Sequence, residues 1–321
     1  MRTFVRIAAL CTVLVAGPAF AQSYPNRNVR ILVPFAAGGP TDVVARLVGQ
    51  KLSERLGQQF IIENQAGAGG NLGMGTAARA PADGYTILFV SSSYVVNPSL
   101  YQKIPYDPEK DFVPITKAAA APNALIVNPA VAAKTVQELV DLIKADPSKF
   151  NIASPGIGTT PHLSIELFKQ AFGLNDLLVV PFNGGTPAIQ AVVAGHTPLS
   201  FQAIPPATAL IKDGRLRALA ITAAKRSPVL PDVPTMDELG AKGQEAETMQ
   251  GVLAPAGTPK EIVDLLQREI AAIVALPDVK AKILALGFEP SGITSAEFGA
   301  YIKAEIAKWR RVIEQAKMDK I

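Results

Sequence analysis

Short apolar runs alternate with amphipathic patterns along most of the chain. The apolar run at 29–34 predicts a strand. Residues 41–56 carry apolar side chains three and four positions apart, which predicts a helix that ends at Gly57. Further strands are expected at 60–63 and 85–91, on either side of a glycine-rich stretch.

The second part of the chain repeats this alternation. Residues 112–127 contain two apolar runs around the stretch KAAAAPN. A capping box at Thr135–Glu138 predicts the start of a helix. Beyond it we expect strands at 150–154, 177–182, 199–204 and 216–222, with helices at 158–173, 184–195 and 205–214 between them. This alternation is typical of α/β proteins with largely parallel sheets.

The end of the chain is helical, and the length indicates two lobes. A capping box with proline at the first helical position, Thr258–Glu261, follows a proline-rich passage, and two or three helices finish the protein. Because single cores stop growing at about 250–300 residues, we expect two α/β lobes. Lobe 1 would comprise 22–122 and 248–321, and lobe 2 would comprise 123–247, with the last helices packing back on lobe 1. A chain that crosses twice between lobes permits hinge closure around a ligand.

The first residues have the features of a secretory signal peptide. Two arginines precede an apolar stretch at 7–15, and Ala19-Phe20-Ala21 matches an A-x-A cleavage site. The apolar stretch is far shorter than the roughly 20 residues that a membrane-spanning helix needs. We therefore expect residues 1–21 to be removed by cleavage after Ala21 and the mature protein to be exported.

Removal of the signal changes the charge and the cysteine content. The whole chain has 31 basic and 27 acidic residues, so the loss of Arg2 and Arg6 leaves 29 against 27, or +2. This balance, without a block of basic residues and aromatics, does not favour nucleic acid as a partner. Cys11 is the only cysteine and lies within the signal, so the mature chain has no disulfide and no thiolate metal site. No later apolar run is long enough to span a membrane.

Three loops, at 34–42, 154–162 and 181–188, share one plan. Each follows a predicted strand, turns at glycine, and has Thr or Pro at the start of a predicted helix. Free N–H groups at a helix N-terminus, together with the helix dipole, bind anions without a charged side chain. The alternative for any one loop is an ordinary strand-to-helix turn. Three such loops together favour a cleft that binds a carboxylate or a phosphate.

Catalytic and cofactor chemistry has weaker support. The glycine-rich stretch 67–78 fits a relaxed dinucleotide fingerprint, but it does not directly follow a strand, and no Walker loop is present. Only His162 and His196 are available, and no G-x-S-x-G motif occurs. An exported serine hydrolase that uses Ser92 with His162 is the alternative from another class, although a serine that lines a pocket is the simpler interpretation. We expect no cofactor, no metal and no enzymatic activity.

Several motifs occur in a distinctive order along the mature chain: YPNRNVRILVPFAAGGPTD, GAGGNLGMGTAARAPADGYT, KTVQELVDLIKADPSKFNIASPGIGTTPHL, LRALAITAAKRSPVLPDVPTMDELG and VLAPAGTP. In these motifs the chain resembles the Bug family, the extracytoplasmic solute-binding proteins of tripartite tricarboxylate transporters. The resemblance implies a two-lobe periplasmic-binding-protein (Venus flytrap) fold with the ligand cleft between the lobes. It also implies a periplasmic protein, expected to be a monomer, that binds a small organic carboxylate and delivers it to integral-membrane transporter subunits. Presentation of the ligand to a sensor kinase is the alternative.

The resemblance also implies a set of ligand-binding residues. The loop that begins at Phe35 would hold one ligand carboxylate through backbone N–H groups and ordered water, and the serines after the next strand would line the same lobe. Two helix starts would contribute from lobe 2. The expected ligand-binding residues are Phe35, Ala37, Gly38, Gly39, Thr41, Ser91, Ser92, Thr159, Thr160, His162, Asn183, Gly184 and Gly185. Asp42 is expected to be structural, because an acidic residue in the first turn of a helix suits the dipole.

Two departures from the family pattern bear on the ligand. Family members often carry an acidic residue where this chain has Pro198, and its loss argues against an amino-acid ligand. Met249 and Gln250 stand where an aromatic residue is common, which either reshapes the cleft wall or repacks the core. Aliphatic dicarboxylates, tricarboxylates and aromatic or heteroaromatic acids all stay open. Phe35 and Phe182 flank two of the loops and would either stack on a ligand ring or be buried at strand ends.

Overall fold

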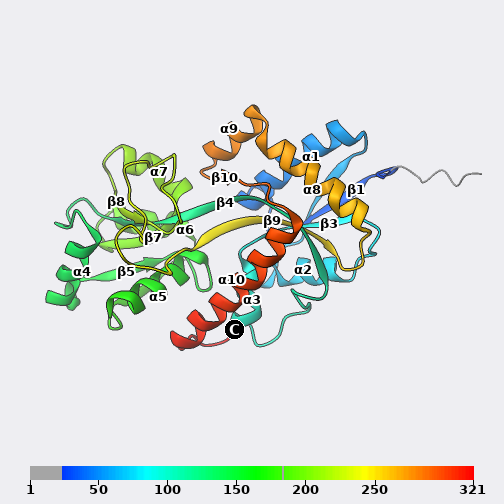
Figure 1. Ribbon diagram of the computed structural model, residues 1–321. Helices are drawn as coiled ribbons and strands as arrows, with labels where there is room; N and C mark the ends of the chain where they lie inside the picture. Colours follow the sequence, from blue (N-terminus) through cyan, green and yellow to red (C-terminus); the bar gives the residue numbers. More distant parts are fainter. Residues whose placement is uncertain (1–23, 183) are drawn as a thin grey trace, which may run out of the picture.

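The computed structural model describes residues 24–182 and 184–321, so the expected signal peptide and Asn183 lie outside the described residues. The chain folds into alternating strands and helices (Figure 1). The strands are β1 Val29–Val33, β2 Phe60–Asn64, β3 Thr86–Ser91, β4 Phe112–Val127, β5 Asn151–Ser154, β6 Leu178–Pro181, β7 Leu199–Ala203, β8 Arg217–Ile221, β9 Glu247–Pro255 and β10 Glu289–Pro290. The α-helices are α1 Pro40–Leu56, α2 Asn71–Ala78, α3 Ser93–Leu100, α4 Val136–Ala145, α5 Thr160–Phe172, α6 Gly185–Val193, α7 Ile204–Lys212, α8 Lys260–Ala275, α9 Pro277–Ala285 and α10 Ser295–Gln315, with 3₁₀ turns at Ala68–Gly70 and Pro147–Lys149.

The α/β alternation predicted from the sequence is confirmed, although the helix α3 was not predicted. The two apolar runs at 112–127 and the alanine-rich stretch between them form a single strand of 16 residues, β4. The small residues in its centre pair in register with β9, for example Ala119 with Gln250 and Pro122 with Glu247, so the ladder continues through them. Alanine has weak strand propensity, but pairing with a neighbouring strand overrides it here.

The strands are ordered β2-β1-β3-β9-β4-β7-β5-β6, with β8 and β10 also paired with β4. The outer pairs β1–β2, β1–β3, β5–β6 and β5–β7 are parallel, as the βα alternation predicts. The pairs that involve β4 and β9 are antiparallel, so the expectation of largely parallel sheets is wrong for the centre. β4 pairs with β9 and β10 through Pro122 and with β7 and β8 from Asn123 onward.

Two long strands therefore join two groups of elements. Figure 1 shows α4–α7 with β5–β8 gathered at one end and α1, α2, α8 and α9 with β1–β3 at the other, while β4 and β9 run between them. The partner change in β4 falls between Pro122 and Asn123, and β9 begins at Glu247. We take the two groups as the lobes of a periplasmic-binding-protein fold and propose 22–122, 123–247 and 248–321 as its division.

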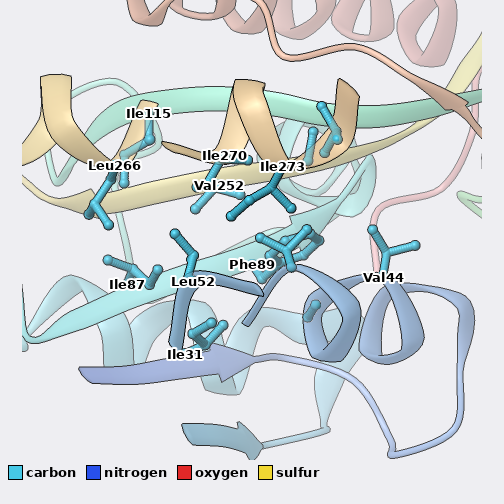
Figure 2. Close-up of a cluster of buried hydrophobic side chains, with 14 of the residues drawn as sticks. Ile31, Val44, Leu52, Ile87, Phe89, Ile115, Val252, Leu266, Ile270 and Ile273 are labelled. Carbon is cyan, nitrogen blue, oxygen red and sulfur yellow. The ribbon is translucent and has the colours of Figure 1, made fainter. Parts of the chain in front are cut away.

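The last helices pack on the first lobe, as expected from the sequence. Figure 2 shows one core, in which Leu52 of α1 and Ile270 of α8 pack on the face of the sheet that carries Phe89 of β3. A second core on the opposite side joins α3 to α10 and includes the fully buried Trp309. Leu163 of α5 belongs to this second core, so apolar packing also links the two lobes next to the connecting strands.

Candidate functional site

A cavity of about 430 Å³ lies between the lobes and is formed by loops that follow the carboxyl ends of strands. This is the usual position for ligands in α/β proteins, and the volume is within the range of small-molecule sites. Its walls are formed by Phe35, Gly69, Ser91, Ser92, Ser93, Asn97, Leu100, Tyr101, Pro155, Ile157, Gly158, Thr159, Thr160, Pro161, Gly184, Gly185, Gln202, Ala203, Pro206 and Thr248.

Several helices begin at this cavity. Ser93, Thr160 and Gly185 are the first residues of α3, α5 and α6, and all three line it. The N–H groups in the first turn of a helix have no acceptor within that helix, and the dipole makes this end positive. The cap of α6 is glycine, which has no side chain to satisfy these groups. The cavity is therefore suited to an anion.

The side chains that line the cavity are neutral. Among the described lining residues there is no Lys, Arg, His, Asp or Glu. Hydroxyls, two amides and backbone groups supply the polar surface, and proline, aromatic and aliphatic side chains supply the rest. An anion in this cavity would be held by N–H and O–H donors, without an arginine or lysine partner.

The two lobes touch at the edges of the cavity. The Thr160 and Thr248 hydroxyls lie 2.7 Å apart and share a hydrogen bond. Gly158, on the loop before α5, faces Leu100 at the end of α3 so closely that an added β-carbon would lie 2.2 Å from Leu100 Cδ2. Gly158 also has φ +74°, a conformation that favours glycine. These contacts form only when the loop 155–159 lies against lobe 1.

The structure brings together seven of the expected ligand-binding residues. Those that line the cavity are Phe35, Ser91, Ser92, Thr159, Thr160, Gly184 and Gly185. Thr159 also caps α5, since its hydroxyl accepts a hydrogen bond from the His162 N–H at 3.3 Å. Asn183 lies outside the described residues. Two of the three predicted glycine loops, those before α5 and α6, therefore converge on one site.

Of the first glycine loop, only Phe35 lines the cavity, and the ligand contacts predicted for its backbone N–H groups stay a prediction. Ala37, Gly38, Gly39 and Thr41 are not among the residues that line the cavity. The Gly38 N–H is already used, because it donates to Asp42 Oδ2 at 2.8 Å. Asp42 is buried and also accepts from Arg46 Nε at 2.9 Å and from Asn64 Nδ2 at 2.8 Å. Burial acts to raise the pKa of Asp42, but the hydrogen bonds from Arg46, Gly38 and Asn64 outweigh it and hold this pKa below its ordinary value. The Asp42 carboxyl group thus occupies one of the backbone N–H groups of the loop that was expected to hold the ligand.

His162 is likewise a supporting residue rather than a lining residue. Its side chain is buried, and its Nδ1 accepts a hydrogen bond from the Gly158 N–H at 3.2 Å. Burial, and to a lesser degree the charge of Lys169, lower the pKa of His162 to about 4. The ring is therefore neutral near pH 7, and its free nitrogen lone pair fixes the loop 155–159.

The Ser92 hydroxyl has a structural role. Its Oγ donates to the Glu247 carbonyl oxygen at 2.8 Å and accepts from the Met249 N–H at 2.9 Å, so it joins the start of α3 to β9. Both partners are backbone groups, and His162 Nδ1 is bonded to Gly158. The hydrogen bonds of Ser92 and His162 therefore give no support to a serine nucleophile that is activated by histidine.

Several lining residues were not predicted. Gln202 and Ala203 are the last two residues of β7, directly before α7, so this strand leads into a helix start without a glycine loop. Gly69 belongs to the glycine-rich stretch that resembled a dinucleotide motif. Tyr101 and Thr248 reach the cavity through contacts between distant segments, for which the sequence contains no local signal.

Within 24–182 and 184–321, no group of three or more His, Cys, Asp or Glu side chains is positioned to hold a metal ion. Over the same residues, no helix has the length and apolar character needed to cross a bilayer.

Comparison with known proteins places the chain in a family. Residues 44–318 match the family model described as "Tripartite tricarboxylate transporter family receptor". The chain is 35% identical over 308 residues to protein BugT of Bordetella pertussis, a match that covers 95% of this chain and 94% of that protein.

Solved structures agree with this match. The periplasmic binding protein BugD is 36% identical, with a TM-score of 0.76 over 93% of this chain and 100% of that one. R. palustris Rpa4515 with adipate is 35% identical, with a TM-score of 0.79 over 93% and 100%. MatC from Rhodopseudomonas palustris with bound malate is 33% identical, with a TM-score of 0.74 over 90% and 100%. The chain therefore belongs to the family of tripartite tricarboxylate transporter receptors, the Bug proteins, and has their periplasmic-binding-protein fold.

Proposed function

We propose that this protein is a periplasmic solute-binding protein that captures a small organic carboxylate in the cavity between its lobes. The observation that carries this proposal is the convergence of helix N-termini on a cavity lined by neutral side chains. Such a site stabilises a carboxylate through preorganised N–H dipoles. The adipate and malate bound in related structures support the same ligand class. Membership of a family of transport receptors favours binding over catalysis.

The ligand carboxylate is proposed to lie against the helix starts of both lobes. Ser93 at α3 would contribute from lobe 1, and Thr160 at α5 and Gly185 at α6 would contribute from lobe 2. Ser91 and Thr159, which also line the cavity, would complete the polar surface around it. A charge-assisted hydrogen bond of this kind contributes about 1.5–3 kcal/mol, so several are sufficient for tight binding.

Binding is proposed to be coupled to hinge closure. Because the donors come from both lobes, a ligand binds the closed form more tightly than the open form and shifts the equilibrium toward it. Bending would be confined to β4 and β9 near Pro122 and Glu247, where the pairing partners change. The apolar packing of α5 on α10 lies beside these strands and would keep the lobes attached on that side.

Export and delivery complete the proposal. Residues 1–21 would direct the chain to the periplasm and be removed after Ala21. The closed form, as a monomer, would deliver its ligand to the integral-membrane subunits of a tripartite tricarboxylate-type transporter. Presentation to a sensor kinase uses the same cavity and is the alternative for the partner.

Thermal unfolding with matched acids and amides tests the proposed function. The mature protein is unfolded and refolded to remove carried-over ligand, and its melting temperature is measured with adipate, malate and benzoate and with the corresponding primary amides. A ligand of the folded state raises the melting temperature by mass action. We expect at least one acid to raise it and its amide to have no effect. No rise with any acid, or an equal rise with the amide, would show that the cavity is not a carboxylate site.

A further inference from the structure

The walls of the cavity carry information about the body of the ligand as well as its charge. We propose that the preferred ligand is a carboxylate on an apolar, ring-sized body, with aromatic acids as the best-fitting members, and not a hydroxylated di- or tricarboxylate. This inference rests on the proposed function, because it assumes that the cavity binds a carboxylate.

The lobe 1 wall carries two aromatic rings beside its serines. Phe35 and Tyr101 both line the cavity, and between them lie the consecutive glycines Gly69 and Gly70. A β-carbon added at Gly70 would lie 3.3 Å from Phe35 Cε1, and one added at Gly69 would lie 2.7 Å from Tyr101 Oη. Because φ is +63° at Gly69 and +95° at Gly70, a side chain is disfavoured at either position. The cavity wall at Gly69, beside the Tyr101 ring, therefore carries no side chain, which leaves room for a ring-sized ligand body.

The opposite wall presents an uncovered aliphatic side chain. Ile157, on the loop before α5, lines the cavity and is 60% exposed. Pro155 and Pro206 line the cavity with it from lobe 2. An apolar ligand body would cover Ile157 and gain the free energy of removing its surface from water. A hydroxylated body would instead lose hydrogen bonds to water against these side chains.

The described side chains that line the cavity are all neutral, which does not suit a highly charged ligand. Without a cation in the lining, each additional carboxylate that leaves water has only dipoles to compensate it. One of the two amides is also turned away: Asn97 Nδ2 donates to the Gly69 carbonyl at 3.1 Å and to Asn71 Oδ1 at 2.8 Å. Both amide hydrogens of Asn97 are thus used within the protein, and only its oxygen is left to face a ligand, where it would repel a second carboxylate.

Calorimetric titration with four ligands tests this inference. Benzoate and cyclohexanecarboxylate carry apolar ring bodies, whereas malate and citrate carry hydroxyls and additional carboxylates. We expect the first two to bind at least tenfold more tightly than the last two. Binding of malate or citrate as tightly as benzoate would overturn the inference and leave the proposed function standing. No binding of any of the four would overturn the inference, and the thermal-unfolding comparison with adipate would then decide the proposed function.

A pair of matched variants tests whether the apolar wall is used. Ile157→Ser should weaken benzoate binding by about tenfold, because the ligand no longer buries an aliphatic side chain. Ile61→Ser is the control, since Ile61 is 51% exposed on the edge strand β2 and does not line the cavity. Equal benzoate affinity in the two variants would contradict the inference. A normal melting temperature for both confirms that each variant is folded.

Discussion

The contact between Gly158 and Leu100 provides a direct test of lobe closure. A β-carbon at position 158 would lie 2.2 Å from Leu100 Cδ2, whereas two carbon atoms are at their best separation at about 3.5–4.0 Å. Leu100 is only 2% exposed and packs in the core that includes α3, but it also lines the cavity, so its side chain has room to move only toward the ligand space. In Gly158→Ala either the loop 155–159 retreats from lobe 1 or the Leu100 side chain turns into the cavity, and both changes disturb the ligand site.

The expected loss can be estimated from the contacts that this loop supports. Retreat of the loop would remove the charge-assisted hydrogen bond proposed at Thr160, worth about 1.5–3 kcal/mol. The dissociation constant for the tightest carboxylate should therefore rise about ten- to a hundredfold in Gly158→Ala, measured by titration calorimetry. The left-handed backbone at position 158, with φ +74°, should separately lower the free energy of unfolding by about 1–2 kcal/mol.

Two further variants separate the clash from the backbone effect. Gly173 has φ +65° and nothing within 4 Å of an added β-carbon, so Gly173→Ala should lower stability to a similar degree and leave affinity unchanged. Leu100→Val in the Gly158→Ala background shortens the opposing side chain and should restore much of the affinity, a coupling that a double-mutant cycle measures. Equal affinities for Gly158→Ala and Gly173→Ala would show that binding does not bring this loop against Leu100.

Three other predictions follow from individual side chains. The His162 pKa is about 4 in the folded protein and about 6.5 in the unfolded chain, so the stability linked to its neutral ring is fully present above pH 6.5 and is lost as the pH falls toward 4. Between pH 7 and pH 4 the free energy of unfolding should fall by about 3 kcal/mol more in the wild type than in His162→Asn; equal slopes in urea titrations would contradict this. Thr160→Val removes the 2.7 Å hydrogen bond to Thr248 and should weaken carboxylate binding by about three- to tenfold in calorimetry, whereas unchanged affinity would show that this link is not part of the bound state. Gln250 is fully buried, and neither of its amide atoms has a partner within the described part of the chain, so Gln250→Met should leave the free energy of unfolding within about 1 kcal/mol or raise it; a loss above about 2 kcal/mol would indicate a bound water at this amide.

Most of the helices and strands could be predicted, because the apolar side chains that give the sequence its periodicity are the ones that pack in the cores. The helix 41–56, for example, places Val44 and Leu52 on the face that packs against the sheet. The helix α3, in contrast, was missed, because its sequence contains valines and Pro98, which do not favour a helix. It forms because one face packs on α10, a contact between segments about 200 residues apart that no local pattern reveals.

The candidate site could be predicted in part for a similar reason. The loops before α5 and α6 could be predicted from local sequence alone. A glycine turn between a strand and a helix leaves the first N–H groups of that helix without an acceptor, whatever the direction of the helix in the fold. The loop at Gly38 obeys the same rules, yet Asp42 of the same chain occupies its donor. Tyr101 and Thr248 reach the cavity only through the tertiary arrangement. Local chemistry thus identifies candidate donors, and packing decides which of them stay free.

A crystal structure of the mature protein with its tightest-binding carboxylate would show directly whether the cavity between the lobes is the ligand site. We expect a carboxylate group between the lobes, with its oxygens within hydrogen-bond distance of the N–H groups of Thr160 and Gly185 and with no basic side chain in contact. A carboxylate paired with Lys or Arg, or bound outside the cavity between the lobes, would contradict this expectation.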